Sequence, residues 1–102
     1  MIAVENTEIE LNSAPDAKLR RELLENAAMI LTTLKGTNPQ NRGMGLEADT
    51  VGRAGHTAMG AYSVQAIEQI SLYEPRLAVA EVDFEAGGDK IIPKVVLKYN
   101  GG

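Results

Sequence analysis

Apolar and polar residues alternate in some stretches of the chain and follow a helical spacing in others. Over Thr7–Leu11 the apolar residues alternate with acidic and amide side chains, which predicts a short, half-exposed strand. A helix is predicted over Asp16–Lys35, because its apolar residues fall at helical spacing, at positions 19, 23, 24, 27, 28, 30, 31 and 34. We expect Ser13 to cap this helix and Gly36 to end it.

The stretch 36–55 is polar and rich in glycine. It predicts a long loop with a short turn or strand around Met44–Ala48. Loops of about twenty residues are uncommon in compact domains and are often functional or ordered by a partner. A second helix is predicted over Thr57–Tyr73, with Thr57 as its cap. Pro75 ends this helix, because proline lacks an N–H and disfavours helical geometry in the residue before it.

The last quarter of the chain alternates again and predicts a β-hairpin, with strands over Leu77–Glu85 and Lys90–Tyr99. Pro93 has no N–H and therefore should not stand where it would have to donate to the partner strand. A two-residue loop about the glycines would place it there. We therefore expect the four-residue loop Ala86–Asp89, which keeps the same side-chain partners and turns the nitrogen of Pro93 outward.

The expected register brings apolar residues together on one face of the hairpin and opposite charges together on the other. The expected pairs are Phe84 with Ile91, Ala80 with Val95, Glu85 with Lys90, and Glu81 with Lys94. Opposite charges that face each other across strands support such a register. Together the patterns predict an α+β fold in a single domain, residues 1–102. In it, two main helices pack on a small, mostly antiparallel sheet with a C-terminal β-hairpin.

Composition narrows the possible functions. The chain has 102 residues, 44% of them hydrophobic and 24% charged, which is typical of one globular domain. A net charge of −4 argues against non-specific binding of nucleic acid. We expect a cytoplasmic protein, since no apolar run could span a bilayer and the N-terminus lacks a signal-peptide pattern. The absence of cysteine excludes disulfides and thiolate chemistry, and the composition favours binding over catalysis.

Candidate catalytic and metal-binding groups are few. His56 is the only histidine and no metal-ligand spacing surrounds it, so neither a metal nor a cofactor is expected. Glu81, Asp83 and Glu85 share a strand face at a spacing that a glycosidase pair could use. Lysines are expected to face them across an open hairpin, where nothing would raise the pKa of one acid above that of the next. We interpret them as a solvated row of charges.

The junction between the second helix and the hairpin holds an acid, a proline and an arginine. Pro75 stiffens the backbone there, so Glu74 and Arg76 are presented in a set direction and lose less freedom when they bind. Arginine also suits bidentate contacts to carboxylates. Two interpretations follow from the spacing alone. Glu74 and Arg76 either pair within the fold or contact a partner protein.

The Glu-Pro-Arg-Leu sequence of Glu74–Leu77 follows an apolar helix and precedes an alternating strand. It resembles the Glu-Pro-Arg signature of the GPW/gene-25-product family, which includes baseplate wedge proteins of contractile phage tails and TssE of type VI secretion systems. Asn26–Gly36, with its Ile-Leu-Thr-Thr, is similar to the end of a family helix. The family usually continues with Gly-Glu-Arg and then Pro-x-Phe-Gly. The resemblance implies equivalent roles for Gly36 and Arg42 here, although the spacing differs and the phenylalanine is missing. The resemblance covers about residues 19–100.

This resemblance implies a structural protein that joins the baseplate wedge and starts sheath assembly by strand addition. The hairpin Leu77–Tyr99 would supply the platform for the added strand. Sheath and wedge proteins would be its partners, with six copies in each baseplate, no nucleic acid and no membrane insertion. It would assemble in the bacterial cytoplasm and reside in the baseplate of a phage tail or contractile injection particle. The residues implied in protein binding are Glu74, Pro75, Arg76, Gly36 and Arg42.

Two other functions remain open. A protein-binding regulator similar to the anti-adaptor IraD would share the fold, and a lysozyme-like hydrolase has been described in the family. The sequence offers no buried acid with a carboxylate partner, so it favours the hydrolase least. Neighbouring genes would distinguish these functions, since sheath, tube and wedge genes would accompany a baseplate protein.

Overall fold

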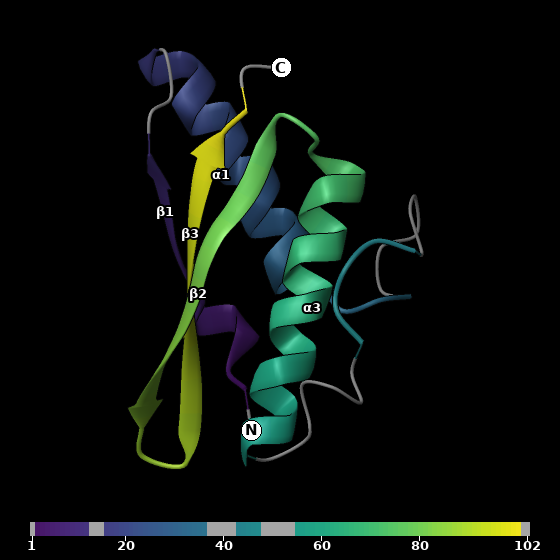
Figure 1. Cartoon of the computed structure of the whole chain (residues 1–102), viewed down its shortest axis with the longest axis vertical. Helices are drawn as coiled ribbons and strands as arrows, with labels where there is room; N and C mark the ends of the chain where they lie inside the picture. Colours follow the sequence, from purple (N-terminus) through teal and green to yellow (C-terminus); the bar gives the residue numbers. More distant parts are fainter. Residues whose placement is uncertain (1, 13–15, 37–42, 48–54, 101–102) are drawn as a thin grey trace.

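The computed structural model describes residues 2–12, 16–36, 43–47 and 55–100. A three-stranded sheet forms one layer, and two helices cover one of its faces (Figure 1). This arrangement confirms the predicted α+β fold with a C-terminal hairpin. In chain order the elements are the 3₁₀ turn η1 (Val4–Asn6), β1 (Glu8–Asn12), α1 (Ala17–Thr32), α3 (Gly55–Tyr73), β2 (Leu77–Gly87) and β3 (Lys90–Tyr99).

The sheet is mixed, with the strand order β1-β3-β2. β3 lies at the centre, antiparallel to β2 and parallel to β1, whose ladder runs from Glu8↔Lys94 to Asn12↔Lys98. Both helices lie on the same face of the sheet, where α1 packs against β1 and α3 packs against β2 (Figure 1). Both β1 and β2 are therefore edge strands.

The ends of the helices differ from the sequence-based prediction. Asp16 is the cap of α1, and its Oδ1 accepts a hydrogen bond from the N–H of Leu19 at 2.7 Å. Ser13 lies outside the described residues. Thr57 is not the cap of α3, because the helix already begins at Gly55 and places Thr57 in its first turn.

α1 ends at Thr32, three residues before the predicted end, because Thr33 takes an extended conformation. That conformation lets Thr33 and Lys35 hydrogen-bond to Leu46, and Leu34 forms a parallel bridge with Leu46. Of the short turn or strand expected around Met44–Ala48, the described residues 43–47 hold a single bridge residue, Leu46, and no named strand. The rest of the expected loop over 36–55 lies mostly outside the described residues, and Gly55 belongs to α3.

The four-residue hairpin loop and the register built on it are wrong. β2 continues to Gly87 and a two-residue loop follows, in which Gly88 has φ +70°. Compared with the expected register, each residue of β2 beyond the bulge is paired two positions further along β3. The observed pairs include Phe84↔Pro93, Asp83↔Lys94, Glu85↔Ile92, Ala86↔Ile91 and Glu81↔Val96.

The observed register still accommodates proline. Gly87 and Lys90 flank the two-residue loop and therefore form a hydrogen-bonded pair, and such pairs alternate along the ladder. Phe84↔Pro93 is consequently a non-hydrogen-bonded pair, in which β2 needs no N–H from Pro93. The nitrogen of Pro93 faces the β1 side instead, just before the ladder with β1 begins at Lys94.

A β-bulge between Val79 and Glu81 changes which side chains of β2 enter the core. The sequence pattern places Ala78 and Ala80 on the same face as Val82 and Phe84. The extra residue reverses the alternation, so that Leu77 and Val79 join Val82 in the core while Ala80 is exposed. As a result Leu77 is buried and Val79 is partly buried, in positions where the expected alternation would have placed the smaller side chains of Ala78 and Ala80.

The core lies between the sheet and the helices. Its fully buried members include Leu23 and Leu31 of α1, Tyr62 and Ile70 of α3, and Leu11, Val95 and Leu97 of the sheet. The Tyr62 ring meets the Phe84 ring edge-on, with centroids 5.7 Å apart. Burial raises the pKa of Tyr62 to about 12, with a smaller opposing effect from the Thr7 hydroxyl. No well-formed hydrogen bond reaches the Tyr62 hydroxyl from the described residues.

Candidate functional site

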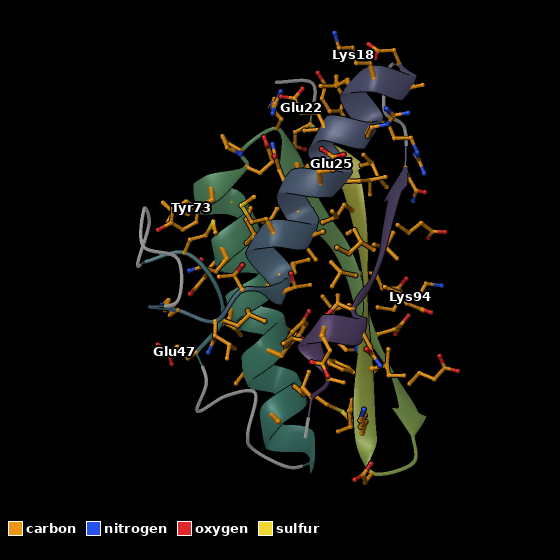
Figure 2. The ribbon with its side chains drawn as sticks, turned by 180° about the vertical axis from the view of Figure 1, so that it is seen from behind. Lys18, Glu22, Glu25, Glu47, Tyr73 and Lys94 are labelled. Atoms are coloured by element: carbon orange, nitrogen blue, oxygen red, sulfur yellow. The ribbon has the colours of Figure 1, made fainter. Side chains whose placement is uncertain are left out.

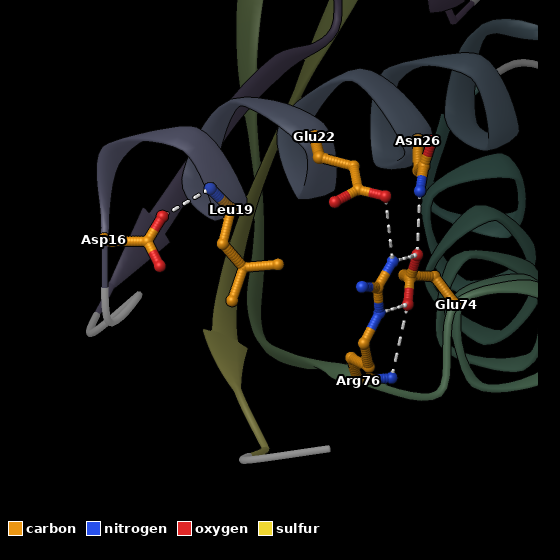
Figure 3. Close-up of polar contacts among 6 residues, drawn as sticks. All are labelled: Asp16, Leu19, Glu22, Asn26, Glu74 and Arg76. Carbon is orange, nitrogen blue, oxygen red and sulfur yellow. Dashed lines mark hydrogen bonds and ion pairs between the residues drawn. The ribbon is translucent and has the colours of Figure 1, made fainter.

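The candidate site is the Glu74–Arg76 corner, which consists of Glu74, Pro75 and Arg76 between α3 and β2 (Figure 3). The N–H of Glu74 donates to the carbonyl of Ile70 at 2.8 Å and so extends the helical pattern by one residue. Pro75 cannot donate in this way, and the chain turns until the N–H of Leu77 donates back to the Glu74 carbonyl at 3.0 Å. β2 therefore starts directly from a fixed turn.

Arg76 binds the Glu74 carboxylate with two parallel hydrogen bonds. Its Nε donates to Oε1 at 2.8 Å and its Nη2 donates to Oε2 at 2.9 Å. Such side-on pairs are among the strongest charge-assisted contacts in proteins. The two side chains differ in exposure, since that of Glu74 is only 5% exposed while that of Arg76 is 35% exposed.

Helix α1 supplies the other contacts of the corner (Figure 3). The Asn26 Nδ2 donates to Glu74 Oε2 at 2.9 Å, across 48 positions of sequence. The Glu22 Oε1 lies 3.8 Å from Arg76 Nη2, a looser pair in which the Glu22 side chain is 59% exposed. The corner therefore joins α1, α3 and β2 through one buried carboxylate.

The electrostatics of the corner keep both groups charged. Hydrogen bonds from Arg76 lower the pKa of Glu74, and this effect exceeds the opposing effect of burial. Glu74 in turn raises the pKa of Arg76. A carboxylate with a lowered pKa is a poor general acid near neutral pH. The corner is thus suited to holding elements together and to presenting one cation at the surface.

The structure places the predicted site residues at separate locations. Glu74 and Arg76 pair within the fold, which is one of the two interpretations that their spacing allowed, and whether they also contact a partner stays a prediction. Gly36 lies in the turn beyond the C-terminal end of α1, with φ +88° and open space around it. Arg42 lies outside the described residues.

A second connection between elements was not apparent in the sequence. The N–H of Gly45 donates to the side-chain oxygen of the buried Gln69 at 2.8 Å, and the N–H of Glu47 donates to that of Gln65 at 3.0 Å. These glutamines stand four residues apart on α3, so they bind the segment 43–47 along one face of the helix. Glutamines at helical spacing are the only signal in the sequence, and it is a weak one.

The two sheet edges differ in how they are covered. On the outer side of β1, the carbonyl of Leu11 accepts a hydrogen bond from Nη1 of Arg20, which reaches across from α1. No hydrogen bond from a described residue reaches the side of residues 78–87 of β2 that faces away from β3. The longer edge is therefore the open one, as far as the described part of the chain shows.

The face of the sheet opposite the helices carries charges. Lys94 of β3 stands between Glu8 of β1 and Asp83 of β2, and Figure 2 shows its side chain on the side away from the helices. Glu81 and Glu85, by contrast, stand opposite Val96 and Ile92 rather than opposite lysines. The two expected acid–lysine pairs, Glu85 with Lys90 and Glu81 with Lys94, are therefore wrong, and Lys94 faces Asp83 instead.

A shallow hollow of about 290 Å³ lies beside the corner. The two share Asn26 of α1, which lines the hollow and also donates to Glu74. Its other walls are Met29, Ile30, Met44 and Tyr73. Met29 is more than half exposed. Flexible methionines are typical of surfaces that adapt to a partner.

No family model, curated protein or solved structure matches the chain significantly. Within the described ranges, no helix is long and apolar enough to cross a bilayer.

Proposed function

We propose that this chain is a structural, non-catalytic baseplate protein of a contractile tail or a related injection or secretion machine. It joins the wedge and starts sheath assembly by accepting a strand. The observation that carries the proposal is the open edge of β2 along residues 78–87, whose outward N–H and C=O groups form no hydrogen bond with a described residue. An incoming strand satisfies such groups in register. Assembly with six copies per baseplate, starting in the bacterial cytoplasm, belongs to the same proposal.

The motifs of the sequence support this function alongside the edge. Asn26–Gly36 and Glu74–Leu77 resemble segments of the GPW/gene-25-product family. In the fold, Asn26 of the first motif donates to Glu74 of the second. The two motifs that carry the resemblance are therefore in contact, although residues 37–73 separate them in the sequence.

The corner contributes rigidity to the docking edge. β2 leaves the corner directly at Leu77, and the corner is bonded to α1 through Asn26. A strand held in this way loses little freedom when a partner pairs with it, which favours binding. The exposed part of Arg76, next to Glu22, offers polar contacts at the start of the edge.

Binding rather than catalysis is supported by the charge state of the buried acid. General acids in hydrolases have raised pKa values, whereas the pKa of Glu74 is lowered. In the parts of the chain that the structure describes, no group of three or more histidine, aspartate or glutamate side chains could hold a metal ion.

Deletion of the gene in the producing strain tests the proposal. Electron microscopy of the released particles should show tails or tubes without a sheath, and the wild-type gene supplied in trans should restore sheathed particles. Sheathed particles at normal yield after deletion would reject the proposal, and so would a genome without sheath genes.

A matched pair of variants connects this phenotype to the β2 edge. Ala86 turns its N–H toward the open side, so Ala86→Pro removes one outward donor without removing a hydrogen bond to β3. Ala86→Ser keeps the donor and serves as the control. We expect complementation by Ala86→Ser and a reduced number of sheathed particles with Ala86→Pro, both proteins being folded by circular dichroism.

A further inference from the structure

The hydrogen-bond pattern of β2 determines which of its groups face the open edge. The pair Gly87↔Lys90 flanks the loop and is hydrogen-bonded, so the hydrogen-bonded pairs with β3 recur at Glu85 and Asp83. The residues between these pairs turn their N–H and C=O groups away from β3. They are Val82, Phe84 and Ala86. A new strand would form its hydrogen bonds with these three residues.

The side chains along this edge alternate in character. Val82 and Phe84 pack against the core beneath α3, whereas Glu81, Asp83 and Glu85 are exposed on the opposite face. None of these three carboxylates forms an ion pair with a cation among the described residues. Asp83 faces Lys94, but Glu81 and Glu85 face apolar residues of β3. Negative charge is therefore left uncompensated along the edge.

We infer that the β2 edge takes an extended segment of a partner protein in which basic side chains alternate with apolar ones. The inference rests on the strand addition proposed above and adds the chemistry of the partner. When the segment pairs antiparallel to β2, its residues opposite Asp83 and Glu85 fall in non-hydrogen-bonded pairs, where side chains approach most closely. Basic side chains there meet the carboxylates.

The character of the residues that alternate with the basic ones in the partner segment follows from the two-layer fold. Residues opposite Val82 and Phe84 point to the same face as these side chains, because facing residues of a sheet share a face. That face is covered by α3, which packs on β2. Apolar side chains at these positions extend the core layer, and polar ones there would be left without partners.

Synthetic peptides test the inference on the full-length protein. The probe is a short peptide in which lysine and valine alternate, and the first control replaces each lysine with glutamate. A second control keeps the composition but groups the lysines together. In ¹H–¹⁵N spectra, the lysine–valine peptide should shift the amide signals of Val82, Phe84 and Ala86 and bind about tenfold more tightly than either control.

Charge reversal on the protein gives the reciprocal test. Glu81→Lys with Glu85→Lys removes the two acids that face apolar residues of β3 and keeps Asp83, which stands opposite Lys94. The control, Glu5→Lys with Glu10→Lys, has the same net charge but changes exposed acids away from β2. The first double variant should reverse the preference toward the glutamate peptide, and the control should retain the preference for lysine.

The outcomes separate this inference from the proposed function. Equal binding of the lysine and glutamate peptides at β2 overturns the inference and leaves strand addition in place. Binding that moves other signals, or no binding at all, also overturns it. In every case sheath formation after gene deletion decides the proposed function independently.

Discussion

The Arg76 side chain holds the Glu74 carboxylate side-on with two hydrogen bonds shorter than 3 Å, and Asn26 donates to the same carboxylate from α1. The acid is buried while the guanidinium is partly in solvent. Because three elements meet at one charged group, the stability of the domain should depend on that group more than on other surface charges.

Glu74→Gln should lower the free energy of unfolding by about 2 kcal/mol, because the amide loses the negative charge and one acceptor. In either orientation its NH2 group faces a donor, the Nε of Arg76 on one side or the Nη2 of Arg76 and the Nδ2 of Asn26 on the other. Urea denaturation followed by circular dichroism measures the change. Glu22→Gln is the matched control, since Glu22 is exposed and its ion pair with Arg76 is long, and it should change stability by less than about 0.5 kcal/mol. Equal effects of the two variants would contradict the central position of Glu74.

The pH dependence of stability should report the same carboxylate. The pKa of Glu74 is lower in the folded state than in the unfolded chain, so the unfolded state binds more protons in this range. Its contribution is present above the unfolded pKa and is lost as the pH falls through the folded pKa. Thermal unfolding in a series of acidic buffers should show a smaller loss of Tm in Glu74→Gln than in the wild type.

Arg76→Ala separates a structural from a partner-binding role of the arginine. Removing the guanidinium leaves the buried Glu74 with Asn26, so we expect a folded domain with stability reduced by about 2 kcal/mol. Sheath recruitment should fail at a temperature where circular dichroism shows that the variant is folded. Recruitment at the wild-type level under those conditions would confine Arg76 to an internal role, and a variant that does not fold would do the same.

Tyr62→Phe should leave the stability unchanged or raise it by up to about 1 kcal/mol. The Tyr62 hydroxyl is buried without a hydrogen bond from the described residues, and removing an unsatisfied group relieves its desolvation. Tyr62→Ala, by contrast, should lower stability by about 3–5 kcal/mol, because it removes the ring that packs against Phe84. A clear loss of stability in Tyr62→Phe would show that the hydroxyl has a partner.

Gly45→Ala and Gly36→Ala form a matched pair, since both glycines have positive φ. At Gly45 an added Cβ would lie 2.3 Å from the carbonyl oxygen of Thr33, which is backbone and cannot move aside. At Gly36 nothing lies within 4 Å, so only the conformational strain of about 1 kcal/mol applies. Thermal unfolding should therefore show a much larger loss for Gly45→Ala, and equal losses would contradict the close approach of segment 43–47 to Thr33.

The difference between the expected and observed hairpin shows why register is hard to read from sequence. Pro93 excluded a donor position toward β2, and that constraint is satisfied in both registers. A shift of two residues keeps every side chain of β3 on its face, so the alternating pattern cannot distinguish the registers. In the observed register, a bulge in β2 turns Leu77 and Val79 toward the core.

The sequence by itself determined the properties that depend on neighbouring residues. The helical spacing of apolar residues located α1 and α3, the alternation located β1, β2 and β3, and Pro75 marked where α3 ends and a stiff junction begins. These signals are local, because each arises from the period of one element or from the geometry of one residue.

Only the tertiary structure decided how these elements meet. It placed β3 at the centre of the sheet, left residues 78–87 of β2 without an outward hydrogen bond to any described residue, and buried Glu74 between Arg76 and Asn26. Each of these results depends on contacts between residues far apart in the chain, and none changes the local pattern that the sequence displays. The role of the Glu74–Arg76 pair within the fold therefore depends on the packing of α1 beside the junction, which the local sequence does not specify.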